Sequence, residues 1–237
     1  MGASTAIRLA ELGAAVAVND VSKEAAAETA GRIESAGGRA VAVAADVTDP
    51  GSVASMVERV ATTFGGIDIL VNNAGGGGLT RTFEETTVEV WDQTMALNLR
   101  SVFLCTKAVF PYMKGRGWGR VVNVASIAGR SRSLTGGPQY SASKAGVIGF
   151  TRHVSAELAP FGITVNAVAP SMVATARVRA KYDGMPESAR SRVFSGIPVG
   201  RWSEPEEVAA ANAFLCSEEA GYICGAVLDI NGGAWVG

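Results

Sequence analysis

Two side chains that can move a proton stand four positions apart in the stretch Tyr140-Ser-Ala-Ser-Lys144. Residues i and i+4 of a helix share one face, because the helix turns once in about 3.6 residues. A phenol normally releases its proton at about pH 10, and a neighbouring ammonium lowers that pKa by favouring the phenolate. The pair is therefore a candidate general acid and base. Taken alone, the same spacing also fits two residues on a solvated helix face.

Composition narrows the classes of protein that could carry this pair. The chain has 237 residues, 48% hydrophobic and 18% charged, with a net charge of -1. This length suits one α/β domain or two small ones, and because no linker divides it, we expect a single domain over residues 1–237. The charge gives no basic surface for nucleic acid, and no apolar run can span a bilayer. With no signal peptide at its start, we expect a soluble cytoplasmic protein.

The cysteines and the histidine form no disulfide or metal pattern. Cys105, Cys216 and Cys224 lie in apolar sequence surroundings without a CxxC motif, and His153 is the only histidine. We therefore expect reduced, buried thiols and no metal site. His153 has no patterned partner, so we interpret it as a helix-surface or packing residue rather than a base.

Short apolar runs alternate with helical patterns along the whole chain. We expect strands at residues 14–19, 39–45, 67–72, 120–125, 163–169 and 227–231. We expect helices at residues 3–12, 23–36, 50–64, 87–115, 140–161 and 205–217. Continuously apolar strands are typical of a sheet covered on both faces. Strand–helix alternation with right-handed crossovers predicts an α/β fold with a doubly wound parallel sheet.

Several residues that could bind a ligand stand where the expected strands end, namely Asp20, Asp46, Asn73, Ser126 and Pro170. In a doubly wound sheet, ligands bind at the carboxyl ends of the strands. Asp20 can accept both ribose hydroxyls of an adenosine, but it fits a capping or turn aspartate equally well. Asp46 has the same ambiguity and can bond an adenine amino group. Asn72-Asn73-Ala74-Gly75 fits either a turn or a backbone lying close against a flat ring.

The order and spacing of these motifs resemble the short-chain dehydrogenase/reductase family, from Gly2 to the C-terminus. The matching residues are Asp46-Val47, Asn72-Asn73-Ala74-Gly75, Asn98, Ser126, Tyr140-Ser-Ala-Ser-Lys144, Asn166-Ala-Val-Ala-Pro170 and Asn231-Gly-Gly233. The resemblance implies a Rossmann-like fold. It also implies an NAD(P)-dependent oxidoreductase that interconverts a secondary alcohol and a ketone by hydride transfer.

The resemblance implies a role for each residue near the reacting carbon. Tyr140 would be the general acid in carbonyl reduction and the base in alcohol oxidation. Lys144 would lower the pKa of Tyr140 and hold the nicotinamide ribose. Ser126 would hydrogen-bond the substrate oxygen. Asn98 would hold a water that links Lys144 to solvent, although a helix-interior asparagine bonded to local backbone is the alternative.

The same resemblance assigns the cofactor contacts. They are Gly2, Asp20, Asp46, Val47, Asn73, Ala74, Gly75, Pro170, Val173 and Thr175, together with Tyr140 and Lys144. Asp20 stands where the family marks NAD preference, and Val21 rather than an arginine follows it, so NAD is favoured over NADP. Thr175 and the Val173 backbone would bond the nicotinamide carboxamide. Ser171 stands where the family usually has glycine, so we expect altered backbone geometry there.

The start of the chain departs from the family pattern. The family opens with a strand and a TGxxxGxG turn, whose N–H groups and helix N-terminus hold the pyrophosphate. Here a helix follows Met1-Gly2 directly, and Gly2 alone matches the turn. That strand would lie between the strands at residues 14–19 and 67–72, so we expect two unpaired edges and a large apolar slot. Either a further segment belongs upstream, which we favour, or the chain is truncated; as it stands we expect weak or absent dehydrogenase activity.

Three functions stay open at this point. The first is oxidation of a sugar, polyol or other small alcohol, and the second is reduction of a 3-oxoacyl thioester. Asp20 favours the first, because enzymes of the second kind more often use NADPH. The third is a non-catalytic binding or subunit protein, for which the incomplete turn is the only argument. Substrate identity is expected to lie in residues 130–137 and 172–200, the latter as a mobile lid, and the resemblance implies a homotetramer.

Overall fold

The computed structural model describes residues 1–76, 82–131, 136–184 and 196–236. Its strands are β1 (Ala15–Asp20), β2 (Arg39–Ala44), β3 (Ile69–Asn72), β4 (Gly119–Val124), β5 (Ile163–Pro170) and β6 (Val227–Ile230). Its α-helices are α1 (Gly2–Glu11), α2 (Lys23–Ser35), α3 (Pro50–Phe64), α4 (Val88–Met95), α5 (Ser101–Arg116), α6 (Pro138–Leu158), α7 (Ala176–Asp183) and α9 (Pro205–Cys216). The predicted alternation of strands and helices is confirmed.

The helices begin and end at residues whose chemistry favours those positions. Ser22 caps α2 by accepting a hydrogen bond from the Ala25 backbone N–H. Asp49 caps α3 in the same way, and Pro50 occupies its first turn. Gly65 ends α3 with a φ of 77°, a left-handed conformation that glycine adopts without strain. These local signals are strong, and they explain why the predicted boundaries agree closely with the observed ones.

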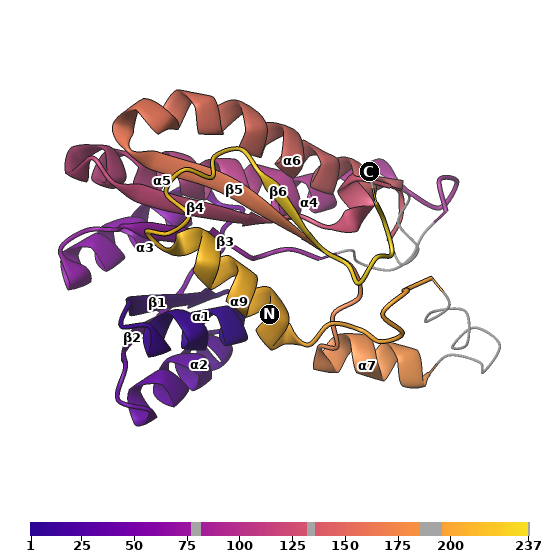
Figure 1. Ribbon diagram of the computed structural model, residues 1–237, viewed down its shortest axis with the longest axis horizontal. Helices are drawn as coiled ribbons and strands as arrows, with labels where there is room; N and C mark the ends of the chain where they lie inside the picture. Colours follow the sequence, from indigo (N-terminus) through magenta and orange to yellow (C-terminus); the bar gives the residue numbers. More distant parts are fainter. Residues whose placement is uncertain (77–81, 132–135, 185–195, 237) are drawn as a thin grey trace.

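All strand pairs are parallel, but they form two sheets rather than one (Figure 1). The larger sheet has the order β3-β4-β5-β6, and β1 pairs with β2 alone. Among the described residues, no strand pairs with the other edge of β1 or with the edge of β3 opposite β4. The parallel pairing expected from the sequence and the expectation of two unpaired edges are therefore both confirmed.

A large cavity separates the two sheets. Its volume is about 1490 Å³, and all four residues of β3 and all six of β1 line it. Apolar side chains of α1, including Leu9, and of α3 and α5, including Val57 and Val109, also border it. We refer to this cavity as the slot. The predicted apolar slot is thus confirmed.

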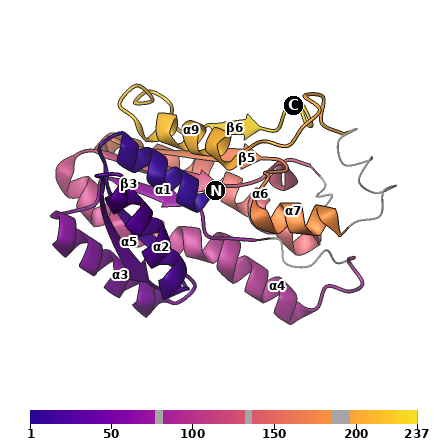
Figure 2. The same cartoon turned by 90° about the horizontal axis from the view of Figure 1, so that it is seen from below.

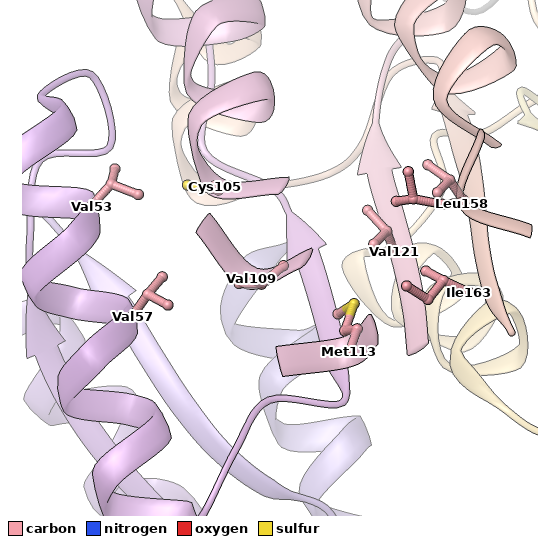
Figure 3. Close-up of a cluster of buried hydrophobic side chains, with 9 residues drawn as sticks. Val53, Val57, Cys105, Val109, Met113, Val121, Leu158 and Ile163 are labelled. Carbon is pink, nitrogen blue, oxygen red and sulfur yellow. The ribbon is translucent and has the colours of Figure 1, made fainter. Parts of the chain in front are cut away.

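The core of the larger sheet follows the two-residue period of its strands. Val121 points to a cluster with α3, α5 and α6, whereas Val122 points to a second cluster with α9. Figure 3 shows the first cluster, in which Val57, Val109 and Met113 are buried. The sheet therefore has helices on both faces, as Figure 2 also shows. This sandwich fixes the end of β4, where the candidate catalytic residues lie.

The expected single helix at residues 87–115 is corrected. It consists of α4, a π-helical segment η1 (Ala96–Arg100) and α5. A π-helix widens the turn by one residue, and such segments are frequent at functional sites. Asn98 lies in this segment and has no exposed surface.

Other expectations from the sequence have mixed outcomes. His153 is exposed and bonds Glu157 on the same helix, which confirms the surface interpretation. Burial raises the pKa of the Cys105 thiol to about 11 and that of Cys216 to about 12, but Cys224 is exposed, contrary to expectation. No helix within the described ranges is long and apolar enough to cross a membrane. In the same ranges, no group of His, Cys, Asp and Glu side chains could hold a metal ion.

The segments expected to recognise the substrate are only partly described. Residues 132–135 and 185–195 lie outside the described residues. The segment 172–200 was expected to lack regular structure, but it contains the helix α7. Thr175 explains that helix, because its hydroxyl caps it by accepting a hydrogen bond from the Val178 N–H.

Candidate active site and cofactor pocket

Lys144 is the most deeply buried ionisable group at the end of β4. Its side chain lies inside the protein, and its Nζ donates a hydrogen bond of 2.7 Å to the carbonyl of Val124, the last residue of the strand. Burial lowers the pKa of Lys144 to about 8, because a buried ammonium loses its hydration. The Nζ lies 6.0 Å from the centre of the Tyr140 ring, one helical turn earlier. The structure thus brings the predicted pair together on one face of α6.

Close backbone approaches hold α6 at this place. A Cβ atom on Gly129 would lie 2.6 Å from the Lys144 carbonyl carbon, and one on Gly146 would lie 2.7 Å from the Leu99 side chain. The contact of Gly129 is with backbone atoms, so only glycine permits it, whereas at Gly146 a larger residue would have to displace the end of the Leu99 side chain. The first brings the turn that follows Ser126 directly against Lys144. The second seats α6 on the π-helical segment that carries Asn98.

Ser126 lies at the same edge of the sheet, just beyond β4. Its hydroxyl accepts a hydrogen bond of 3.2 Å from the Ala128 N–H, which starts the short helix η2 (Ile127–Gly129). The hydroxyl also donates a hydrogen bond of 3.5 Å to the carbonyl of Pro170, the last residue of β5. Because β4 and β5 are parallel neighbours, their carboxyl ends place Ser126 and Pro170 side by side. A hydroxyl in this position can donate to an oxygen bound at the sheet edge.

Asn98 connects the catalytic helix to the loop after β3. Its Oδ1 accepts from the Gly76 N–H at 2.8 Å, and its Nδ2 donates to the Gly76 carbonyl and to the Ser143 hydroxyl, both at 3.0 Å. Ser143 in turn donates to the Tyr140 carbonyl at 2.8 Å. The alternative of a side chain bonded to local backbone is therefore wrong, since Gly76 is 22 positions away. The predicted water is a separate matter and stays a prediction.

Gly75 lies between these groups and marks the limit of the available space. Its φ is 159°, and a Cβ atom there would lie 2.7 Å from Asn98 Oδ1 and 3.3 Å from Lys144 Nζ. A side chain at this position would therefore displace the side chains of Asn98 and Lys144. The Gly75 end of the Asn73-Ala74-Gly75 loop therefore lies directly against Lys144.

The residues expected to contact the adenosine part of a nucleotide also line the slot. Asp20, Asp46, Val47, Asn73, Ala74 and Gly75 all border that cavity, and Gly2 joins them from α1. Asp20 accepts from the Ser22 N–H, and Asp46 accepts from the Thr48 N–H and hydroxyl, which lowers the pKa of Asp46. Both aspartates thus make the turn contacts foreseen as one alternative. Their exposed carboxylates leave the nucleotide contacts as a prediction.

Asn73 gives a structural test of whether a nucleotide fits this pocket. Its Oδ1 is buried without a hydrogen-bond partner among the described residues. A buried acceptor without a partner destabilises the fold, so a donor such as a ribose hydroxyl would satisfy it. A Cβ atom on Gly2 would lie 2.6 Å from Asn73 Nδ2, so the N-terminus of α1 presses against the same side chain. The residues present at this point fit a nucleotide.

The arm after β5 carries Val173 and Thr175, which were expected to contact a nicotinamide. Val173 pairs with Ser203, and the Ala174 N–H donates to the Ser203 carbonyl at 2.8 Å. The Arg179 guanidinium holds this arm by donating to the Ala174 carbonyl and, through two bonds, to the Glu204 carboxylate. Ser171 has no positive φ, because among the described residues only glycines do, so serine fits there without strain.

Comparison with known proteins places this geometry in a family. A family model described as enoyl-(acyl carrier protein) reductase matches residues 1–234. The chain belongs to the short-chain dehydrogenase/reductase family. It is therefore an oxidoreductase of alcohol and carbonyl groups, and members of its family use NAD or NADP.

Individual members of the family match almost the whole chain. The cis-4-hydroxycyclohexanecarboxylate dehydrogenase of Sinomonas cyclohexanicum is 42% identical over 233 residues, which are 98% of this chain and 91% of that enzyme. The acetoacetyl-CoA reductase of Allochromatium vinosum is 41% identical over 240 residues, 100% and 94% of the two chains. The crystal structure of levodione reductase superposes with a TM-score of 0.92, at 35% identity, and covers 98% and 92%.

Some residues of this short-chain dehydrogenase/reductase site were missed in the sequence. Ser143, Gly76 and Gly129 act through helix phase or backbone approach, and neither is visible without the fold. Only Ser143 carried a signal, since it stands three residues after Tyr140 and so shares its face. Arg179 and Glu204 are 25 positions apart, and nothing in the sequence pairs them.

Proposed function

We propose that Tyr140 is the general acid and base of an enzyme that interconverts a secondary alcohol and a ketone. The observation that carries the proposal is the buried Lys144 ammonium, held against the end of β4 and one turn from Tyr140. A positive charge in a site of low dielectric stabilises a phenolate more strongly than it would in water. Tyr140 can then take or give a proton near neutral pH.

Each remaining residue of the site has a role in this scheme. In reduction, the Tyr140 hydroxyl gives its proton to the substrate oxygen; in oxidation, the phenolate takes it back. The Ser126 hydroxyl donates a hydrogen bond to the same oxygen and steadies its developing charge. Asn98 positions Gly75 and α6 through Gly76 and Ser143, and we retain its proposed water. A bound nicotinamide supplies or accepts the hydride.

We propose NAD as the preferred cofactor. Asp20 would accept the ribose hydroxyls and repel a 2′-phosphate, while Asn73, Ala74 and Gly75 would lie along the ribose. Asp46 and Val47 would border the adenine, and Gly2 the pyrophosphate. On the nicotinamide side the contacts would come from Lys144, Tyr140, Pro170, Val173 and Thr175. The proposal further includes one NAD(P)-binding domain over residues 1–237, a homotetramer and a cytoplasmic location.

Two substrate classes follow from the relatives. A small alcohol, open-chain or cyclic, is our first proposal, because a 42% identical relative oxidises a hydroxycyclohexane carboxylate and Asp20 disfavours NADPH. A 3-oxoacyl thioester is the second, because the acetoacetyl-CoA reductase is 41% identical. Hydride transfer at a CH–OH carbon is common to both, so the roles of Tyr140 and Lys144 are the same.

The proposal is tested by a screen of secondary alcohols and ketones, including acetoacetyl-CoA, with NAD and NADP as paired cofactors. We expect weak turnover with at least one pair, because Gly2 alone matches the pyrophosphate-binding turn, and a preference for NAD that Asp20→Ser reduces about tenfold by admitting the 2′-phosphate. Nucleotide binding is followed separately by quenching of the four tryptophans. If no pair turns over and NADH quenches nothing, the non-catalytic binding protein is the better account.

A further inference from the structure

Ser126 and Arg130 stand at the two ends of the same short helix, η2. Ser126 caps its start, and Arg130 follows its last residue, with the Arg130 N–H bonded to the Ile127 carbonyl at 2.9 Å. A helix of three residues has too few hydrogen bonds of its own to fix its position. The place of the Ser126 hydroxyl, the proposed donor to the substrate oxygen, therefore depends on what holds η2 from outside.

Helix α6 and strand β6 hold η2 from two sides. On the first side, Gly129 lies directly against the Lys144 backbone. On the second side, the Arg130 Nε donates to the Asp229 carboxylate at 3.2 Å, and its Nη2 donates to the Val227 carbonyl at 2.9 Å. Both acceptors belong to β6, almost a hundred positions further along the chain. Removing the Arg130 side chain would leave η2 held by α6 without its bonds to β6.

The strand register brings the bonds of Arg130 close to those of the Ser126 hydroxyl. Asp229 of β6 pairs with Ala169 of β5, the residue that precedes Pro170. The Pro170 carbonyl accepts a hydrogen bond from the Ser126 hydroxyl. Both ends of η2 therefore bond to neighbouring positions of one pair of strands. A displacement at the Arg130 end would tilt η2 and move the Ser126 hydroxyl.

The C-terminal turn adds a third contact to the Arg130 guanidinium. The guanidinium carbon lies 4.9 Å from the centre of the Trp235 ring, within the range of a cation–π interaction. The Trp235 carbonyl accepts from the Asn231 side chain at 2.9 Å, which fixes the turn that carries the ring. The Arg130 side chain is 15% exposed and that of Asp229 is 27% exposed, so solvent screens this ion pair less than a pair on the open surface.

We propose that Arg130 is a positioning residue for the reaction: it fixes η2 against β6 and so places the Ser126 hydroxyl for its bond to the substrate oxygen. The inference rests on the proposed function, in which Ser126 donates to that oxygen. The segment that begins at residue 130 was expected to recognise the substrate, whereas the Arg130 guanidinium bonds the protein itself. A donor displaced by about 1 Å can cost up to about a hundredfold in rate.

The test is a double-mutant cycle with Arg130→Met, Ser126→Ala and the two combined, in the alcohol and ketone assay. Methionine has a long side chain but donates no hydrogen bond. We expect Arg130→Met to lower kcat about tenfold and to change the substrate KM and nucleotide binding less than about twofold. In the Ser126→Ala background the same substitution should change kcat less than about twofold, because no hydroxyl is left to position.

Arg116→Met is the matched control. The Arg116 guanidinium also bonds one carboxylate and one backbone carbonyl, those of Asp68 and Gly65. These bonds lie at the amino ends of β3 and β4, whereas Ser126 follows the carboxyl end of β4. We expect Arg116→Met to change kcat less than about twofold, although it removes the same kinds of bond.

Native-state amide exchange gives a second readout, which needs no turnover. The Ala128 N–H donates to the Ser126 hydroxyl, so its exchange reports on the start of η2. Val122, fully buried in β4, reports on the stability of the whole fold. We expect Arg130→Met to accelerate exchange at Ala128 at least about tenfold more than at Val122. The control Arg116→Met should accelerate both amides by the same factor.

Three results would overturn the proposal. The first is exchange at Ala128 that Arg130→Met accelerates no more than exchange at Val122. The second is a loss of kcat as large in the Ser126→Ala background as in the parent, which indicates a general structural role. The third is a raised substrate KM with unchanged kcat, which indicates that Arg130 contacts the substrate. If the parent turns over no substrate, the proposed function fails, and exchange at Ala128 still decides whether Arg130 positions Ser126.

Discussion

The candidate catalytic residues at the end of β4 and the residues that line the slot are held in place in different ways. Lys144 and Asn98 are buried and bonded to residues far away in the chain, at Val124, Gly76 and Ser143. Asp20 and Asp46, on the slot side, are exposed and accept hydrogen bonds within their own turns. The chemistry is therefore organised by tertiary contacts that need no ligand. The nucleotide side depends on local turns beside a cavity.

This contrast predicts its largest effect at Tyr140. The substitution Tyr140→Phe removes the proton donor and keeps the ring, so we expect the turnover rate to fall by about 10²–10⁴ relative to the parent chain in the same assay. Nucleotide binding, followed by tryptophan quenching, should fall far less than turnover, because Tyr140 makes only one of the proposed nucleotide contacts. Tyr222→Phe is the control, because Tyr222 is fully exposed on the surface. A Tyr140→Phe variant that keeps a tenth of the parent turnover rate would contradict the role of Tyr140 as general acid and base.

The second prediction concerns the pH dependence of stability. The pKa of Lys144 is lowered from 10.5 to about 8 in the folded chain. Between these values the unfolded chain binds more protons, so the free energy of unfolding rises with pH through this window. At neutral pH the buried ammonium destabilises the fold by on the order of 3 kcal/mol. Relative to Lys144→Met, the parent should gain up to about that amount between about pH 7 and pH 10.5 in urea unfolding.

The exposed Lys107, in α5, offers the control substitution Lys107→Met for the loss of a lysine as such. If the free energies of unfolding of the parent and of Lys144→Met differed by the same amount at every pH between about 7 and 10.5, the lowered pKa of Lys144 would be contradicted.

The third prediction compares one side-chain type in both regions. Asn98→Ala leaves the Gly76 N–H and carbonyl without their partner inside the protein, which should lower the free energy of unfolding by about 2 kcal/mol. Asn19→Ala, beside the slot, removes bonds to the Val43 and Ala45 carbonyls at the carboxyl end of β2, where both residues border the cavity. Water can replace those, so we expect a loss of about 0.5–1 kcal/mol. If chemical denaturation showed that Asn98→Ala and Asn19→Ala lower the free energy of unfolding equally, the distinction between the two regions would be contradicted.

Much of this fold could be predicted from its sequence because its signals are local. Caps such as Ser22 and Asp49, and glycine at the end of α3, mark helix boundaries without any tertiary information. The slot could also be predicted, because a parallel sheet with helices on both faces requires a partner for every central edge. The π-helical segment could not, because the contact between Asn98, which it carries, and Gly76 is visible only in the fold.

The candidate site divides in the same way. Tyr140 and Lys144 can be identified from their helical spacing, and Asp20 and Asp46 from their positions directly after strands. Gly129 gives no such signal, because its role is to let the Ser126 turn approach Lys144. Helix α7 could not be predicted, because its one clear signal, the cap Thr175, fits a cofactor contact as well.

The central claim is that β1 and β3 face each other across an open slot, and native-state amide hydrogen exchange tests it most directly. Val18 and Leu70 direct their N–H groups to neighbouring strands, whereas Ala17, Ile69 and Val71 direct theirs into the slot. The account predicts alternation along each strand: slow exchange at Val18 and Leu70, and exchange at least about a hundredfold faster at the slot-facing amides. Uniform protection against amide exchange along β1 and β3, measured on the protein alone, would contradict it.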